Sequence, residues 1–159
     1  MNLLSFCQWV SETPVGQAMS RSPWAFAVIE SVHLLALAVI GGAVLLVDLR
    51  LLGFGLREQP VRDIARNAWP WFVGSLAVML ATGFMLFLSE PVKCFYSTPF
   101  RVKMASLLLG MVFAFTVRRK VSLAAEGRIN PLIYKLVAVV SLALWFGVGA
   151  GGRWIGFSG

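Results

Sequence analysis

Three ionisable residues in very apolar surroundings are the part of this sequence best suited to chemistry. His33, the only histidine, stands in the segment VIESVHLLALAVIGG (28–42), and Glu30 precedes it by three residues. Lys103 lies near the start of a second apolar segment, FRVKMASLLLG (100–110). Ionisable groups are costly inside a bilayer, so each suggests a function. A neutral imidazole in an apolar wall is a suitable axial ligand for haem iron, and we assign His33 as the candidate haem and metal ligand.

A haem site would also use the charged residues expected at the same level as His33. Haem propionates require cationic or polar partners near the membrane interface. We assign Glu30 and Lys103 as candidate catalytic residues that set the electrostatics of the pocket. The basic residues expected on this side are Arg21, Lys93, Arg101, Lys103 and Arg153, of which the last three are our cofactor-binding candidates.

The single histidine excludes a bis-histidine haem within one chain. The sixth iron position would be empty, or filled by Lys103, Met104, another side chain or a second subunit. Two other interpretations remain open. His33 could simply bond a neighbouring helix while Glu30 pairs with Lys103, or the three residues could relay protons or ions. Transport ranks below a redox role, because four short helices with no visible inverted repeat leave little room for alternating access.

The composition indicates which elements position these residues. The chain has 159 residues, 58% hydrophobic and 13% charged, whereas soluble proteins have roughly 45–50% apolar and about 25% charged residues. Four stretches are long enough to cross about 30 Å of hydrocarbon as helices. The expected spans are 24–47, 68–88, 100–117 and 131–150. The fold class is therefore all-α, an integral membrane four-helix bundle over residues 23–159.

Residues that begin or end helices, and an amphipathic segment, complete this organisation. Prolines 23, 99 and 131 suit the first turns of three spans. The triplet SEP (89–91) should end the second span, and RRK (118–120) should close the third. Residues 1–22 form a separate segment, in which 2–20 are expected to be an amphipathic helix on the membrane surface. A signal peptide is not expected, because no basic region precedes the first apolar residues.

The loop charges predict the orientation in a bacterial inner membrane. The positive-inside rule places basic loops in the cytoplasm and hence both termini in the periplasm. The same rule explains the net charge of +7 without nucleic acid, which we exclude as a partner. The nine basic residues of the predicted cytoplasmic side are Arg50, Arg57, Arg62, Arg66, Arg118, Arg119, Lys120, Arg128 and Lys135.

Several segments resemble the HemJ-type protoporphyrinogen oxidases and related small bacterial four-helix membrane proteins. The segment ESVHLLALAVIGGAVLLVDLRLLG (30–53) resembles the first helix of that family, with its histidine, small residues and inner-end arginine. FRVKMASLLLGMVFAF (100–115) resembles the third helix, which opens with a lysine. GRINPLIYKLVAVV (127–140) is loosely similar to the segment before the last helix.

The resemblance implies specific roles. HemJ-type proteins bind b-type haem through the first-helix histidine and need the third-helix lysine for porphyrinogen oxidation. His33 would then be the haem ligand, Lys103 the second functional residue, and Arg50 the inner-end arginine. The sequence departs from that pattern by adding Glu30, the N-terminal surface helix and an outer-side cysteine pair.

Other features support the bundle. Cys7 and Cys94 are both expected on the oxidising outer side, where they either form a disulfide or remain thiols. Asp48 at the inner end of the first span is expected to pair with Arg118 or Arg119. Glycines allow close helix approach or room for a flat macrocycle; they are Gly41, Gly42, Gly74, Gly83 and Gly110. The run WFGVGAGGRW (145–154) is expected to fray the last helix, where Arg153 could meet a propionate.

Together these observations predict a haem b protein with a redox role, either electron transfer or an oxidase-like reaction. The expected partners are membrane lipid, a quinone or porphyrin substrate, and a second copy or a redox partner subunit. The alternatives are a proton- or ion-coupled transporter and a non-haem accessory subunit of a larger membrane complex.

Overall fold

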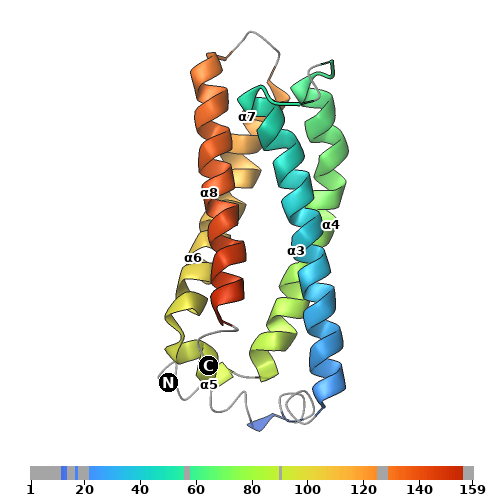
Figure 1. Ribbon diagram of the computed structural model, residues 1–159, viewed down its shortest axis with the longest axis vertical. Helices are drawn as coiled ribbons and strands as arrows, with labels where there is room; N and C mark the ends of the chain where they lie inside the picture. The colour runs from blue at the N-terminus through green and yellow to red at the C-terminus, as the bar shows by residue number, and fades with distance from the viewer. Residues whose placement is uncertain are drawn as a thin grey trace.

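The computed structural model describes residues 12–13, 17, 22–55, 58–89, 91–124 and 129–155. Within these ranges the regular structure is entirely helical, and four long helices run side by side in alternating directions (Figure 1). All four are long and apolar enough to cross a membrane. The predicted all-α, four-helix membrane bundle is confirmed. Its elements are α3 (Pro23–Leu52), α4 (Val61–Ser89), α5 (Pro91–Tyr96), α6 (Thr98–Phe113), the π-helix η1 (Ala114–Arg118), α7 (Arg119–Leu123) and α8 (Pro131–Ile155).

Helix starts follow the sequence signals closely. Ser22 caps α3 by accepting a hydrogen bond from the Ala25 N–H, and Pro23 follows it. Ser97 caps α6 in the same way, with Phe100 as the donor. A side-chain oxygen at the cap accepts from one of the first backbone N–H groups, which have no partner within the helix. The last long helix, α8, begins at Pro131 itself, so the predicted starts at the three prolines are confirmed.

The predicted ends were less accurate. RRK does not close the third span, because helical structure continues through η1 and α7 to Leu123. The second helix begins at Val61 rather than residue 68, and its first turn contains Asp63. The spans were predicted from apolar length alone, but charged turns continue a helix into the interface. At 1.5 Å per residue the 30 residues of α3 measure about 45 Å, more than the hydrocarbon thickness.

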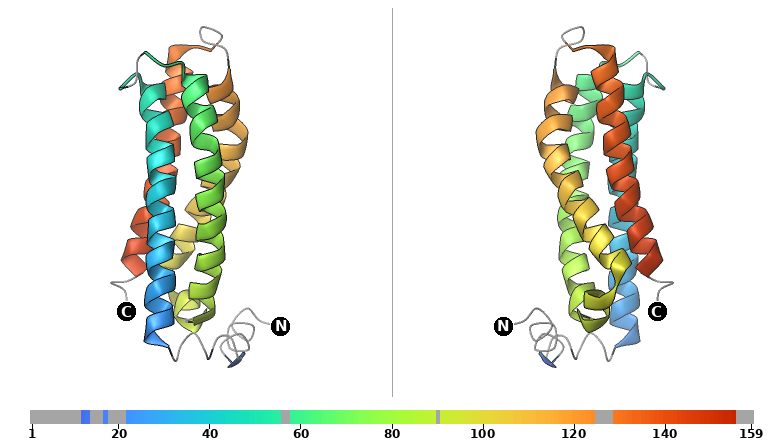
Figure 2. Two further views of the ribbon diagram at one scale, coloured as in Figure 1. Left: turned by 90° about the vertical axis from the view of Figure 1, so that its right-hand side faces the viewer. Right: turned by 90° about the vertical axis from the view of Figure 1, so that its left-hand side faces the viewer.

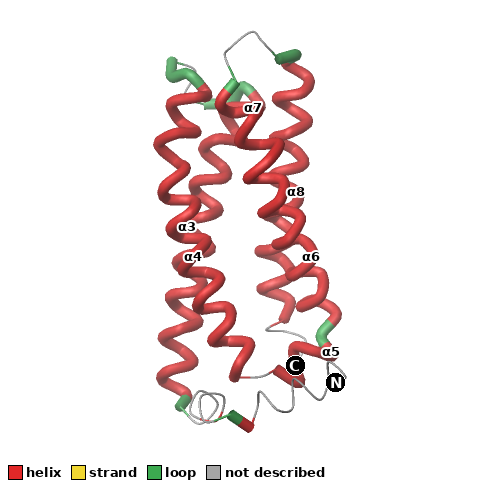
Figure 3. The backbone as a smooth tube through the Cα atoms, turned by 180° about the vertical axis from the view of Figure 1, so that it is seen from behind, coloured by secondary structure: helices red, strands yellow, loops and turns green. Residues whose placement is uncertain are grey.

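The helices form two pairs. Seen from one side α3 lies beside α4, and from the opposite side α6 lies beside α8 (Figure 2). The backbone trace seen from behind shows the α3–α4 pair diverging from the α6–α8 pair towards the end that holds α5 (Figure 3). The site described below lies between the pairs, so residues of both pairs contribute to it.

The core is built around an aromatic cluster from three helices. Phe72 of α4 is fully buried, and its ring lies 5.4 Å from that of Trp145 in α8, at 87°. It also contacts Phe115 of η1 and Trp69 of its own helix. Aromatic rings prefer such edge-on and offset arrangements. The cluster joins both helix pairs near mid-bundle.

One buried ion pair also crosses between the pairs, as predicted for Asp48. Arg118 Nε donates to Asp48 Oδ1 at 2.8 Å, and Arg118 Nη2 donates to the Val44 carbonyl at 3.2 Å. Both side chains are buried, Asp48 at 0% and Arg118 at 5% exposure. Of the two partners considered, Arg118 is the one used.

The predicted N-terminal surface helix lies almost entirely outside the described residues. Of that segment the structure describes Glu12, Thr13 and Gln17, and Ser22 that follows it. The Gln17 N–H donates to the Thr13 carbonyl at 3.0 Å. The division into residues 1–22 and 23–159 stays a prediction.

Candidate functional site: the His33 centre

His33 lies on the buried stripe of α3. The buried positions of this helix recur at intervals of three and four residues, the pattern that places one face of a helix against its neighbours. They are His33, Ala36, Ile40, Ala43, Val44, Val47, Asp48 and Leu51. His33 is the end member of this series and is 7% exposed. The imidazole therefore points into the bundle and not towards lipid.

Thr82 of α4 fixes the orientation of the imidazole. His33 Nδ1 lies 2.9 Å from Thr82 Oγ1. The Thr82 hydroxyl donates its single proton to the Val78 carbonyl at 2.7 Å. Its oxygen is thus the acceptor, and Nδ1 carries the proton. This network assigns the neutral tautomer whose Nε2 presents a lone pair.

Lys103 of α6 lies opposite that lone pair. Its Nζ is 3.4 Å from His33 Nε2, so the amine can donate to the imidazole across the space between the helix pairs. The lysine is half-buried, and its stem passes along α8. The predicted proximity of His33 and Lys103 is thus present as a direct contact.

Two glycines make this contact sterically feasible. A Cβ at Gly83 would lie 3.2 Å from His33 Cε1, and a Cβ at Gly151 would lie 3.1 Å from Lys103 Cβ. Both distances are tighter than ordinary contacts. All four long helices therefore contribute to what we call the His33 centre: His33 (α3), Thr82 and Gly83 (α4), Lys103 (α6) and Gly151 (α8).

The role of the C-terminal glycines differs from the expectation. The run WFGVGAGGRW does not fray, because α8 remains helical to Ile155. Gly147 and Gly151, four residues apart, face Ser106 and Lys103 of α6. Small residues at this spacing let two membrane helices approach closely. Among the glycines singled out earlier, Gly41, Gly42 and Gly74 have no neighbour within 4 Å of an added Cβ, whereas Gly83 and Gly110 do.

Glu30 is exposed and is not part of the centre. Stepping back four residues from His33 continues the buried stripe to Ile29, which is half-buried, whereas Glu30 lies off the stripe. Glu30 and Lys103, both within the described part of the chain, form no ion pair with each other, so the Glu30–Lys103 pair considered from the sequence does not form. The simpler interpretation, in which His33 bonds a neighbouring helix, is realised through Thr82.

Arg101 and Arg153 lie at the same end of the bundle but on its surface. Arg101 is two residues before Lys103, and Arg153 is two residues after Gly151. Positions two apart on a helix do not share a face, and both arginines are exposed. They are placed to reach groups at the interface, not the imidazole itself.

Cys94 is half-buried on α5, close enough to Lys103 for an electrostatic interaction. Cys7 lies outside the described residues. The disulfide between the two cysteines therefore stays a prediction.

The contacts of His33 fit an axial haem ligand. A metal-bound histidine usually donates its second ring N–H to a fixed acceptor, which sets the tautomer and the ring orientation, as Thr82 does here. Within the described ranges no three His, Cys, Asp or Glu residues cluster as a metal-ion site. Haem supplies the equatorial iron ligands itself and needs only axial residues from the protein. Thr82 was missed from the sequence, because a lone threonine on another helix gives no signal of its partner.

Comparison with known proteins places the chain in a family. It belongs to DUF6644, a family of unknown function whose model matches residues 6–158. A search of curated proteins and a search of solved structures found no match.

Proposed function

We propose that this member of DUF6644 is a haem b-binding protein of the bacterial inner membrane with a redox role. The observation that supports the proposal most is the state of His33. The imidazole is buried, its Nδ1 proton is held by Thr82, and its Nε2 lone pair faces the Lys103 amine of the other helix pair. That is the arrangement an axial nitrogen ligand needs.

The chain's own residues would divide the tasks. His33 would ligate the iron through Nε2. Lys103, already 3.4 Å from that nitrogen, would either help to hold the iron or hold a proton beside the bound group. Arg101 and Arg153 would pair with propionates at the interface. Haem, when bound, supplies one-electron chemistry.

The reaction follows from the resemblance to HemJ-type protoporphyrinogen oxidases. There the first-helix histidine and third-helix lysine serve haem binding and porphyrinogen oxidation, and His33 and Lys103 are this chain's matching residues. We propose either an oxidase-like reaction on a porphyrin or electron transfer with a membrane quinone. Both substrates are hydrophobic enough to arrive through the lipid. Under this proposal both termini are periplasmic, and the His33 centre lies in the outer half of the membrane.

The test is an absorbance spectrum of the full chain purified in detergent after expression with ample haem. The proposal requires a Soret band whose intensity corresponds to about one haem per chain or per dimer and which shifts on dithionite reduction. His33→Ala should lose the band. Lys103→Met should keep haem but shift the spectrum if the amine is an axial ligand.

Thr116→Val is the matched control, because Thr116 is exposed and bonds only its own helix at the opposite end of the span. It should retain the full band. A colourless wild-type protein, or a band that survives in His33→Ala at full intensity, contradicts the haem proposal.

A second candidate function has one specific observation in its favour. The Lys103 amine and the His33 imidazole are in direct contact, which is the geometry for passing a proton. A colourless protein that acidifies or alkalises proteoliposomes, and loses that activity in Lys103→Met, would indicate a proton relay.

A further inference from the structure

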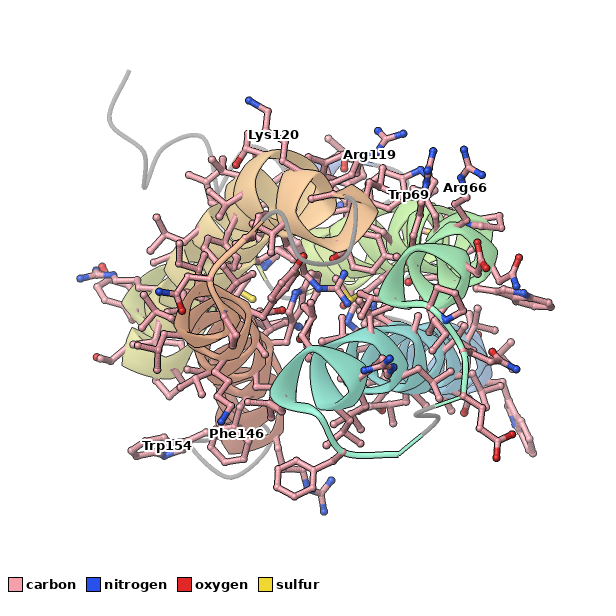
Figure 4. The ribbon with its side chains drawn as sticks, turned by 90° about the horizontal axis from the view of Figure 1, so that it is seen from above. Arg66, Trp69, Arg119, Lys120, Phe146 and Trp154 are labelled. Carbon is pink, nitrogen blue, oxygen red and sulfur yellow. The ribbon has the colours of Figure 1, made fainter. Side chains whose placement is uncertain are left out.

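A second, basic site lies at the opposite end of the bundle from the His33 centre. A cavity of about 250 Å³ opens between α3, α4 and the η1–α7 segment. Its buried wall is apolar and consists mainly of Ala43, Val47, Ala68 and Phe72. Its exposed rim carries Arg66, Trp69 and Arg119, which gather on one side of the molecule seen from above (Figure 4).

The rim is organised by stacking. The Arg119 guanidinium lies 4.2 Å from the centroid of the Trp69 ring, a cation–π contact. Trp69 is in turn held by an edge-on contact with Phe115, at 5.1 Å between centroids and 79°. The planar guanidinium is therefore held beside the cavity, with its edge available to donate hydrogen bonds.

The rim arginines differ from Arg118, which also borders the cavity, in their charge partners. Arg118 also lines the cavity, but its charge is matched by Asp48 at 2.8 Å. Within the described ranges no carboxylate forms an ion pair with Arg66 or Arg119. A guanidinium beside an apolar recess favours a ligand with an anionic head and an apolar body, and its fork of donors suits phosphate oxygens in particular.

We propose that this cavity binds the headgroup phosphate of an anionic phospholipid from the leaflet at the basic end of the bundle. Basic pockets between membrane helices are suited to such headgroups. The volume lies just below the roughly 300–1,000 Å³ of sites that enclose a drug-sized molecule, so it suits a headgroup with the start of an acyl chain. Phe115, whose ring contacts Trp69 of the rim, is 42% exposed, which provides apolar surface for that chain. The inference does not depend on haem binding.

The experiment measures lipid retention by the full chain. Wild type and a double variant, Arg66→Gln with Arg119→Gln, are equilibrated with phosphatidylglycerol or phosphatidylcholine in detergent. Native mass spectrometry then measures the lipid that each protein retains. The wild type should retain phosphatidylglycerol selectively. The double variant should bind it roughly 30-fold more weakly, which corresponds to the loss of about 1 kcal/mol per basic residue. Trp69→Leu, which leaves both charges in place, should weaken retention to a smaller extent.

Lys120→Gln is the matched control, because Lys120 follows Arg119 in α7 but does not line the cavity and lies further round the bundle (Figure 4). It should retain phosphatidylglycerol like the wild type. Circular dichroism verifies that each variant remains helical. Equal retention of both lipids by the wild type, or wild-type retention by the double variant, overturns the proposal. Equally tight binding of glycerol 3-phosphate, which has no acyl chain, would indicate a soluble phosphate ligand instead and also overturns it.

Discussion

At the scale of single residues, one hydroxyl group determines which nitrogen of His33 is available for chemistry. Thr82 uses its proton on its own helix and accepts the imidazole proton, so Nε2 faces Lys103. Thr82 thus supplies a side-chain acceptor for the buried donor Nδ1–H. The tautomer is thus a property of the contact between α3 and α4.

Thr82→Val tests whether the orientation and tautomer of His33 depend on the Thr82 hydroxyl group. The change keeps the shape of the side chain but removes the acceptor, and leaving a buried donor unsatisfied costs about 1–3 kcal/mol. The free energy of unfolding in mixed micelles should fall by that amount, and under the haem proposal the Soret absorbance per chain should fall too. Thr116→Val should change neither. Indistinguishable behaviour of the two variants would show that Thr82 does not hold the imidazole.

Asp48 and Arg118 should behave as a coupled pair. Asp48→Asn leaves a buried guanidinium without its counter-charge, and breaking a buried pair in this way costs about 3–5 kcal/mol. Replacing both residues by leucine should cost less than the sum of the two single replacements. Asp63→Asn, at an exposed carboxylate of α4, is the control and should be nearly neutral. Unfolding titrations of Asp48→Asn, the two single leucine variants, the double variant and the control test this coupling, and strictly additive losses would contradict it.

A residue of the site could be predicted where its own sequence surroundings mark it, and could not where its role depends on a contact with a distant segment. His33 and Lys103 stood out because an ionisable residue in an apolar run is visible in the sequence alone. Glu30 was wrongly placed in the pocket, because the three-residue spacing allowed it to share the face of His33 while the buried stripe in fact continues through Ile29. Thr82 was not predictable, since its partner lies 49 residues away.

At the scale of elements, the glycines of α8 determine how closely the second helix pair packs. Gly147 and Gly151 face α6, whereas Gly149 has no neighbour within 4 Å of an added Cβ. The sequence shows a glycine-rich run but not which glycines face a helix. This is why fraying was expected where the structure has tight packing.

Gly151→Ala and Gly149→Ala form a matched pair of changes. The methyl group at 151 would press on Lys103 Cβ at 3.1 Å and on its Cα at 3.3 Å, so α6 must shift. Overpacking of this kind costs about 1–3 kcal/mol. The methyl group at 149 meets nothing, and alanine favours a helix over glycine by roughly 0.5–1 kcal/mol. The midpoint temperature of thermal unfolding in detergent should therefore fall for Gly151→Ala and rise for Gly149→Ala. Equal shifts would contradict the packing described here.

At the scale of the whole molecule, the basic cavity rimmed by Arg66 and Arg119 and the His33 centre lie at opposite ends of the bundle. The end of α3 and the start of α4 share one end of the bundle with α7 and the start of α8, and α5 shares the other end with the start of α3 (Figure 1). The number of spans could be predicted because each apolar run has about the length that a helix needs to cross the hydrocarbon core. The pairing of α3 with α4 and of α6 with α8 could not, because lipid-facing and helix-facing residues are equally apolar.

The proposed orientation is testable with reporter fusions after residue 159. Periplasmic termini should give active alkaline phosphatase and a dark green fluorescent protein, because each reporter matures on only one side of the membrane. A fusion in the 124–130 loop should give the reverse result and serves as the internal control. A fluorescent fusion after residue 159 would reverse the assignment and place the His33 centre in the inner half.

The π-helix at Ala114–Arg118 divides the third span into two helical segments that are rotated relative to each other. The Arg119 N–H donates to the Ala114 carbonyl, five residues back, so the span contains one residue more than an α-helix of the same pitch would. Residues on either side are offset by about 100° from the positions they would otherwise take. The angle between Lys103 and Arg118 around the helix axis therefore differs from the angle that an uninterrupted α-helix would give. Removing one residue within η1 would restore an uninterrupted α-helix. One of the two side chains would then turn away from its partner. The π-helix is therefore what allows this span to contact His33 at one end and Asp48 at the other.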